Sequence, residues 1–266
     1  MPGDIHEIFA IRYGHHPRPA AENFIGGNDP HDVNMPLDYF VWAIKGEHGT
    51  ILVDTGFDEK VGARRGRTTT KPIREGLLAA GIDASEIQTV IMSHMHYDHS
   101  GNTELFPKAR FHVQDCEMEY ITGRCMCHPQ LRNSFETDYV LSMVRKLYEG
   151  RVDFHDGDDE IVPGVTVHHI GGHTKGLQCV RVNTKRGPVV IAADATHLYA
   201  HIEGGRVFPQ VYNVGDVLEG YKKLNKLAGA NTRVVPGHDP QVLKRYPAAK
   251  PGLEGWIVRL DEEPKA

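Results

Sequence analysis

The sequence lacks a long apolar run and a surplus of basic residues. None of its apolar stretches approaches the ~20 residues that a membrane-spanning helix needs. Its start, MPGDIHEIFAIRY, has no basic end followed by an apolar stretch, so we expect no signal peptide and a cytoplasmic protein with no membrane partner. The formal net charge is -5, and the tightest basic run, residues 64–67, is short and is interpreted as a solvated loop. We therefore expect no nucleic-acid partner.

Cysteine is also scarce, with four residues in 266: Cys116, Cys125, Cys127 and Cys179. Four thiols do not make a disulfide framework in a chain this long, and they fit a reducing cytosol. Cys125 and Cys127, followed by His128, have the residue types of a zinc site. No second Cys/His pair at zinc-finger spacing accompanies them, so a structural or incidental role is favoured over metal binding.

The composition, 40% apolar and 24% charged, is that of an ordinary globular protein with enough chain for a well-buried core. Apolar periodicity and turn residues predict strands at 39–46, 50–56, 87–94, 109–114, 164–172, 177–184, 187–195 and 232–238, and helices at 71–81, 137–150 and 217–229. Asp216 and Glu219 have the spacing of a capping box for the last helix. The alternation predicts one layered α/β domain over residues 1–266, with too many hairpins for a purely parallel sheet.

The stretch SHMHYDHSGN, residues 93–102, concentrates imidazole and carboxylate groups directly after a predicted strand. Three more stretches place a His or Asp directly after an apolar run: HHIGGHTKG with His173, VVIAADATH with Asp194 and VVPGHDP with His238. A rigid sheet positions the loops at its strand ends, so we expect these groups to converge. Together they are His94, His96, Asp98, His99, His173, Asp194 and His238. Seven such ligands are too many for one tetrahedral zinc ion and suit two ions with a position left for water.

Spacing within the motif also favours two ions. His94 and His96 are two positions apart, so at a strand end their side chains point to the same side. Asp98 and His99 follow on the next turn, where the chain can direct them at a second ion.

The remaining histidines are weaker candidates for metal ligands. His168 and His169 face opposite ways on a strand, and loop histidines are expected at the surface: His15, His16, His31, His128 and His201.

The motif His-x-His-x-Asp-His, preceded by LVDTG and followed by GGHTKG, AADA and PGH, resembles the metallo-β-lactamase superfamily. The resemblance implies a four-layer αββα sandwich with two metal ions at one edge. By this resemblance His94, His96 and His173 hold the first ion; Asp98, His99 and His238 hold the second; and Asp194 bridges them. Asp54, in LVDTG, falls where the superfamily places a residue that supports the metal loop. A turn-forming role for this aspartate is the alternative.

Branches of that superfamily differ in chemistry, so the fold alone does not decide the function. His96 stands where flavodiiron proteins have a glutamate, and Asp194 stands where the commonest β-lactamases have a cysteine. The 28 residues after His238 are too few for the helical domain that glyoxalase II adds. RNA-processing members need a basic surface, which the net charge does not favour. The motifs that remain resemble those of the N-acyl homoserine lactonases and related lactone hydrolases.

In that group the segment corresponding to residues 15–39 is a substrate-side loop. Phe24, Ile25, Met35 and Tyr39 are candidates to line an apolar cleft for an acyl chain, or simply to pack the loop down.

The residue three positions after Asp194 differs from that of the lactonase group. Its best-known members have a tyrosine three residues after the bridging aspartate, where this chain has His197, and we expect His197 at the cleft as a substrate contact. Tyr199, two residues further on, is a further candidate for binding substrate.

The resemblance implies a dinuclear zinc hydrolase that opens a lactone ring, of an N-acyl homoserine lactone or a similar small lactone, by attack of a metal-bridging hydroxide. Another divalent transition ion is an alternative to zinc, and a homodimer is an open possibility. Asp98 would pass a proton to the leaving alkoxide, and His197 would donate to substrate oxygen. One alternative keeps this chemistry and replaces the lactone by a thioester or an activated amide. Another is a binding or sensory protein that holds metal without turnover, which the complete ligand set argues against.

Overall fold

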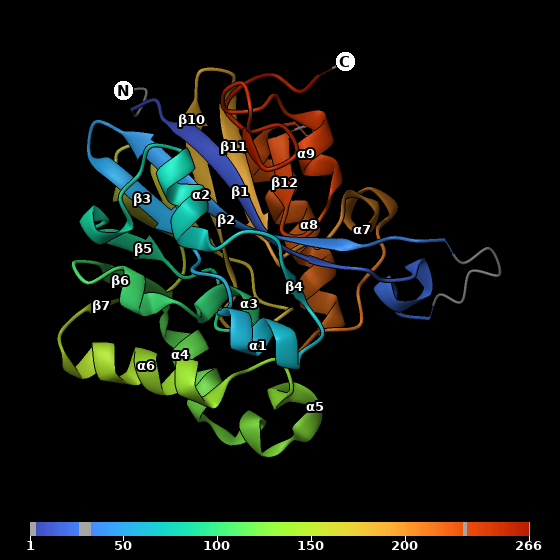
Figure 1. Ribbon diagram of the computed structural model, residues 1–266. Coiled ribbons are helices and arrows are strands. Elements are labelled where there is room, and N and C mark those ends of the chain that lie inside the picture. The colour runs from blue at the N-terminus through green and yellow to red at the C-terminus, as the bar shows by residue number, and fades with distance from the viewer. Residues whose placement is uncertain (1–3, 27–32, 231–232, 266) are drawn as a thin grey trace.

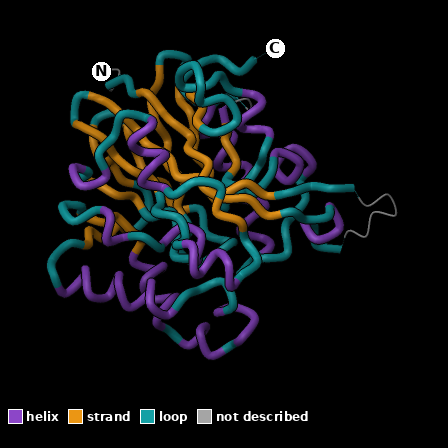
Figure 2. The backbone as a smooth tube through the Cα atoms, in the orientation of Figure 1, coloured by secondary structure: helices purple, strands orange, loops and turns teal. Residues whose placement is uncertain are grey.

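The computed structural model describes residues 4–26, 33–230 and 233–265. Two β-sheets pack face to face and helices cover their outer faces, which gives the expected four-layer αββα sandwich (Figures 1 and 2). The first sheet has the order β13-β1-β2-β3-β5-β6-β7 with β4 beside β1, and the second has the order β12-β11-β10-β9-β8. Antiparallel hairpins and parallel pairs occur in both sheets, as the hairpin-rich pattern predicts.

The elements have the following bounds. The first sheet contains β1 (Glu7–His16), β2 (Leu37–Gly46), β3 (Gly49–Val53), β4 (Thr68–Thr69), β5 (Thr89–Ile91), β6 (Arg110–Gln114), β7 (Val152–His155) and β13 (Ile257–Arg259). The second contains β8 (Asp159–Val162), β9 (Val165–His169), β10 (Gln178–Thr184), β11 (Gly187–Ala193) and β12 (Val234–Pro236). The helices are α1 (Glu59–Arg64), α2 (Ile73–Ala79), α3 (Tyr97–Ser100), α4 (Asp115–Thr122), α5 (Pro129–Arg132), α6 (Thr137–Tyr148), α7 (Tyr199–Gly204), α8 (Val214–Ala228) and α9 (Gln241–Arg245). Short 3₁₀ turns lie at Ala20–Asn23, Ala84–Glu86, Thr103–Leu105 and Arg124–Cys127.

Alternation along the strands builds the layers. In β2, Phe40 and Trp42 point between the two sheets, whereas Tyr39 and Val41 point toward the helices of the outer face. Successive strand residues face opposite sides, so a strand buried on both faces is apolar throughout. Trp42 is completely buried, and burying a side chain of this kind contributes roughly 1.5–3 kcal/mol or more to folding. The sandwich interior is therefore one of the apolar cores that stabilise the fold.

Helix α8 covers the outer face of the second sheet. Val217, Tyr221 and Leu224 lie on one side of the helix, at the three- and four-residue spacing of an amphipathic helix, and pack in one cluster with Val190 of β11. Helices α2, α4 and α6 supply the corresponding buried residues to the first sheet. Each outer layer of helices thus buries the outer face of its own sheet.

The expected capping box on α8 is wrong. The helix begins at Val214, three residues earlier than predicted, and Asn213 is its N-cap. The Asn213 side-chain oxygen accepts hydrogen bonds from the backbone N–H groups of Gly215 (2.9 Å) and Asp216 (3.3 Å). Asp216 therefore lies inside the first turn, where its negative charge is favourable near the helix N-terminus. Glu219 forms an ion pair with Lys222 instead of reaching back to the cap.

The two ends of the chain meet in one sheet, because β13 pairs with β1 in the register Ala10↔Val258. This pairing supports the prediction of one domain over residues 1–266, which stays a prediction. Strands β1 and β13, and β7 and β8, lie outside the strands that periodicity predicted. No helix in the described residues combines the length and apolar character needed to cross a membrane.

Candidate metal centre

All seven predicted ligand residues come together at one edge of the sandwich. They leave strand ends or the turns that follow them: β5 leads into residues 93–99, β9 into His173, β11 into Asp194 and β12 into His238. The ligand atoms form two groups, each with its atoms within 4.8 Å of one another. One group is His94, His96 and His173, and the other is Asp98, His99, Asp194 and His238. All seven side chains are buried.

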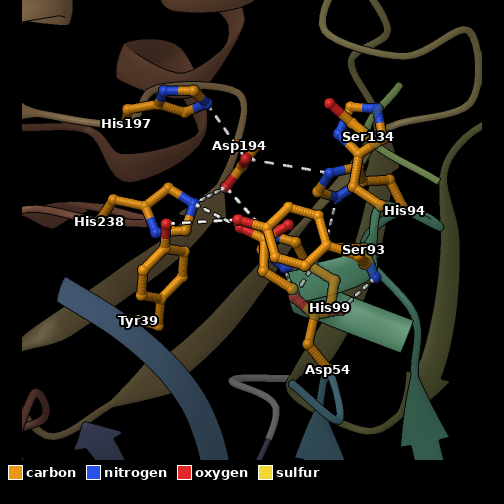
Figure 3. Close-up of polar contacts among 12 residues, drawn as sticks. Tyr39, Asp54, Ser93, His94, His99, Ser134, Asp194, His197 and His238 are labelled. Atoms are coloured by element: carbon orange, nitrogen blue, oxygen red, sulfur yellow. Dashed lines mark hydrogen bonds and ion pairs between the residues drawn. The ribbon is translucent and has the colours of Figure 1, made fainter. Parts of the chain in front are cut away.

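Asp194 lies between the two groups and directs one carboxylate oxygen at each (Figure 3). Its Oδ1 is 2.9 Å from His238 Nε2 and 3.2 Å from His99 Nε2. Its Oδ2 is 3.2 Å from His173 Nε2 and 3.9 Å from His94 Nε2. A carboxylate that shares its two oxygens between two sets of imidazoles has the arrangement of a bridging ligand.

Hydrogen bonds to main-chain oxygens set the orientation of two histidine rings. His173 donates from Nδ1 to the carbonyl oxygen of Gln210 (2.6 Å), and His238 donates from Nδ1 to that of Asp38 (3.0 Å). Each bond places the proton on Nδ1 and leaves the Nε2 lone pair facing the cluster. Metal-binding histidines are commonly held this way, because the second ring nitrogen then fixes the tautomer. Sequence patterns cannot reveal these two acceptors, since any residue has a carbonyl group.

Asp54 forms hydrogen bonds to the loop that carries the predicted ligands of residues 93–99. Its carboxylate accepts hydrogen bonds from the Ser93 backbone N–H and hydroxyl (both 2.7 Å) and from His99 Nδ1 (2.7 Å). Asp54 is completely buried and has φ of +63°, a conformation that costs a non-glycine residue about 1 kcal/mol or more. The structure therefore favours the supporting role over a simple turn-forming role, because the side chain contacts a ligand-type histidine.

Several buried polar atoms of the cluster lack a hydrogen-bond partner among the described residues: His94 Nε2, His99 Nε2, His197 Nε2 and Asp194 Oδ1. Leaving such a group unsatisfied costs ~1–3 kcal/mol. Burial, with His99 nearby, lowers the pKa of His94 well below its usual value, and burial with His173 does the same for His96. Neutral imidazoles, as at His94 and His96, together with the nearby carboxylates are a donor set that fits divalent transition ions. The described residues of the cluster thus suit the metal site that the sequence predicts.

His197 lies at the cluster, as its position after Asp194 predicts. Its Nε2 is 3.1 Å from Asp194 Oδ2, and its ring stacks on Phe208 with centroids 3.7 Å apart. His173, Asp194 and His197 form a third group with ligand-type spacing. The role of His197 as a substrate contact stays a prediction. None of the ligand-type groups found in the described residues contains a cysteine, and all four cysteines are free thiols.

A cavity opens beside the cluster, and two of the predicted substrate contacts, Tyr39 and His197, lie on its wall. Phe24 instead packs against the His201 ring and under the Arg206 guanidinium, and Ile25 is half exposed. The predicted segment 15–39 begins in β1 and ends in β2, and residues 27–32 of it lie outside the described residues. Met35 is also absent from the described cavity wall.

Tyr199 lies in the core between the sheets rather than on the cavity. Helix α7 begins at this residue, its backbone N–H donates to Asp239 (2.9 Å), and the Arg245 guanidinium lies 3.6 Å from its ring centre. The expectation that His201 is a surface residue is wrong. It is completely buried, where it donates to the Asn23 carbonyl oxygen (2.7 Å) and accepts from the Leu198 N–H.

The polar half of the cavity wall comes from residues that no sequence motif marks. Arg65 and Arg67 come from the basic run that was interpreted as a solvated loop, and both face the cavity. His168 and His169 lie outside the cluster, bonded to Asp158 and to the Lys175 carbonyl oxygen. His31 is outside the described residues. The cavity is lined by Arg18, Leu37, Tyr39, Arg65, Arg67, His96, Tyr97, Asp98, Asn133, Ser134, His173, Asp194, His197, Gln210 and His238.

Comparison with known proteins identifies the family. Residues 35–238 match the model of the metallo-beta-lactamase superfamily, and this stretch includes all seven ligand-type residues. The chain belongs to the metallo-beta-lactamase superfamily. The expected fold and the expected class, a metal-dependent hydrolase, are thereby confirmed.

Relatives within the superfamily are named for one activity. An N-acyl homoserine lactonase from Bacillus sp is 30% identical over 185 residues, which is 63% of this chain and 68% of the relative. An N-acyl homoserine lactonase from Rhizobium johnstonii is 28% identical over 189 residues, 64% of this chain and 65% of the relative.

Solved structures share the fold at lower identity. A quorum-quenching N-acyl homoserine lactone lactonase superposes with a TM-score of 0.74 at 23% identity, over 90% of this chain and 94% of the other. A probable metal-dependent hydrolase from Staphylococcus aureus superposes with a TM-score of 0.75 at 17% identity, over 100% and 97% of the two chains. At these identities the superpositions establish the fold.

Proposed function

We propose that this chain is a dinuclear zinc hydrolase that opens the ring of a small lactone, an N-acyl homoserine lactone or a similar compound. The observation that carries the proposal is the position of Asp194, whose two oxygens face two separate groups of histidines. The names of the relatives support the choice of a lactone over other acyl substrates. The buried, unpartnered nitrogens of the cluster support the presence of metal.

The seven ligand residues divide as the family resemblance implies. His94, His96 and His173 would hold one ion, and Asp98, His99 and His238 would hold the other, with Asp194 shared. Two zinc ions, when bound, lower the pKa of water toward ~7 and polarise an ester carbonyl. The protein supplies a buried group of histidines with fixed orientations. Asp54 holds the His99 ring, and main-chain oxygens hold the rings of His173 and His238.

Asp98 is the residue we propose as the proton carrier. Its carboxylate lies on the cavity wall, with Oδ2 3.5 Å from His238 Nε2 and 3.7 Å from His99 Nε2. Tyr13 holds the loop in place by donating its hydroxyl to the Asp98 carbonyl oxygen (2.7 Å). A carboxylate so placed can accept a proton from attacking water and deliver it to the ring oxygen as the ester bond breaks. That delivery matters because an alkoxide is a poor leaving group.

His197 is the residue we propose as the donor to substrate. It lines the cavity beside Asp194, and Phe208 stacks on its ring and limits its rotation. An imidazole N–H in this position can donate a hydrogen bond to the carbonyl or ring oxygen of a lactone. Donors of this kind stabilise the charge that develops on oxygen during acyl transfer.

A substrate panel tests the proposed function. The protein is loaded with zinc, and γ-butyrolactone, an N-acyl homoserine lactone, a thioester and a β-lactam are each assayed by acid release. The proposal expects the lactones to have the highest kcat/KM. A thioester or β-lactam preferred over every lactone would contradict it and would favour the corresponding alternative substrate, and absence of turnover by the zinc-loaded protein would favour the metal-holding binding protein.

A further inference from the structure

The wall of the cavity is strongly cationic. Arg18, Arg65 and Arg67 line it together with the amide side chains of Asn133 and Gln210. Among the described lining residues, the only carboxylates are Asp98 and Asp194, and both belong to the metal cluster. Two divalent ions would add four positive charges against these two negative ones. The open side of the cavity therefore carries several positive charges, and carboxylates outside the cavity wall pair with only part of them.

Two of the three arginines have carboxylate partners. The Arg65 Nε donates to Glu136 Oε1 (2.6 Å), and Arg18 Nε is 3.4 Å from Glu22 Oε2. Arg67 has no carboxylate partner among the described residues, although it is only partly exposed. Burial opposes the charge of Arg67, whereas Tyr39, Tyr97 and Asp98 together raise its pKa above the usual value. Arg67 is thus a charged guanidinium on the cavity wall that forms no ion pair with a described carboxylate.

Neutral contacts hold Arg67 in position. Its Nε donates to the Tyr97 hydroxyl (3.0 Å), and its Nη1 donates to the Arg65 carbonyl oxygen (2.7 Å). Arg65 in turn lies over the Tyr97 ring, 4.3 Å from its centre. Tyr97 sits between His96 and Asp98 in the metal loop. The guanidinium is therefore fixed beside the metal cluster before any ligand enters, which lowers the entropy cost of binding one.

The electrostatic effect of this arrangement is visible at His16. Burial, followed by Arg67 and Arg18, lowers the pKa of His16 from 6.5 to about 4. Burial is the largest cause of this shift, and the charges of Arg67 and Arg18 add to it. Burial lowers the pKa of Arg18; Glu22 and Tyr39 act to raise it, and the charge of Arg67 lowers it further. An anion that enters the cavity would relieve these repulsions.

We infer that Arg67, assisted by Arg18, binds a carboxylate carried by the substrate. The preferred substrate class is then a small lactone with a carboxylate substituent, rather than one with only an uncharged acyl chain. Guanidinium groups suit this ligand, since their planar N–H donors match a carboxylate and form charge-assisted hydrogen bonds. The absence of Phe24, Ile25 and Met35 from the described cavity wall fits this inference, because these were the candidates for an acyl-chain cleft. The inference rests on the proposed lactonase function and names its substrate class.

Two lactones that differ in one group test the inference. The zinc-loaded protein is assayed with 5-oxotetrahydrofuran-2-carboxylate and with the corresponding carboxamide, which has the same ring and nearly the same size. We expect kcat/KM for the carboxylate to exceed that for the amide by about tenfold or more, mainly through KM, as one charge-assisted contact provides. Arg67→Gln should bring the ratio near one, and Arg67→Lys should restore part of it.

The matched control is Arg110→Gln, an exposed arginine on β6 that pairs with Asp153 away from the cavity. It should leave the ratio unchanged. If Arg67 merely supports the metal loop through Tyr97, Arg67→Gln will slow both lactones equally and keep the ratio, which would overturn the inference. A wild-type ratio near one would overturn it as well.

A binding measurement separates this inference from the proposed function. The ring-opened products of the two lactones, a dicarboxylate and its monoamide, are titrated calorimetrically into the zinc-loaded protein. If neither these two lactones nor the lactones of the substrate panel are hydrolysed, the proposed function fails, but tighter binding of the dicarboxylate by wild type and not by Arg67→Gln would still support the carboxylate site. Equal affinities for the two products in wild type would overturn it.

Discussion

His99 donates its Nδ1 proton to the carboxylate of Asp54, at 2.7 Å, and so turns its Nε2 toward Asp194 (Figure 3). Asp54 also receives the backbone N–H and the hydroxyl of Ser93, which directly precedes His94 in the chain. The buried carboxylate of Asp54 thus orients His99, a ligand-type residue of the second group. It also fixes Ser93, which directly precedes His94 of the first group.

Asp54→Asn should weaken metal binding and lower kcat/KM by ~10–100-fold, the usual loss when the partner of a metal-binding histidine is changed. The asparagine amide has no negative charge and only one accepting oxygen, so it cannot replace the carboxylate that accepts all three hydrogen bonds from Ser93 and His99. Metal affinity is measured by competition with a chelator, with thermal unfolding as a check on folding. Asp83→Asn, a change at an exposed aspartate, is the control. Unchanged metal affinity in folded Asp54→Asn would contradict the supporting role.

Asp194→Ala should cost more activity than Asp54→Ala. Asp194 contacts both groups of histidines, so its loss removes a negative charge from two ion sites, whereas Asp54 acts through His99 and Ser93. The comparison uses kcat/KM and metal content of the two variants prepared in parallel. A milder effect at Asp194 would show that it does not bridge.

His197→Phe should lower kcat/KM by roughly 10–1000-fold with metal content unchanged, as expected for the loss of a donor to a developing oxyanion. Phenylalanine keeps the stacking on Phe208 and removes the N–H. His169→Gln, outside the cluster, should leave both quantities unaltered. Wild-type kinetics in His197→Phe would refute the donor role, and loss of metal would make His197 a ligand.

Asn213→Ala should destabilise the protein by about 1 kcal/mol, within the 0.5–2 kcal/mol typical of an N-cap. The two backbone N–H groups that Asn213 accepts would lose their partner. Asp216→Ala should cost less, because its side chain contributes charge near the helix start and not the cap. Urea unfolding of both variants measures the difference. A larger loss at Asp216 would restore the capping box that the sequence suggested.

The sequence was sufficient to find the seven ligand-type residues that the fold brings together, for a physical reason. Zinc ligands are drawn from a few residue types, here His and Asp, and a layered fold delivers them directly after apolar strands, so both signals are visible along the chain. His94 and Asp194 are examples, since each follows a buried strand. The layers were predictable too, because buried strands such as β2 are apolar on both faces.

Other features depend on contacts that sequence spacing does not contain. The acceptors for His173 and His238 are main-chain oxygens, which no residue type marks. Tyr199 was selected by its distance along the chain from Asp194, but α7 begins there and carries its ring into the core. Arg67 was assigned to solvent because the basic run is short, whereas the fold brings the run against Tyr97.

The central claim, that this fold holds two metal ions around Asp194, is tested most directly by elemental analysis of the purified protein together with its activity. The account predicts two zinc or equivalent ions per fully active chain, with chelation abolishing lactone hydrolysis and added zinc restoring it. A fully active chain that contains at most one ion would contradict it.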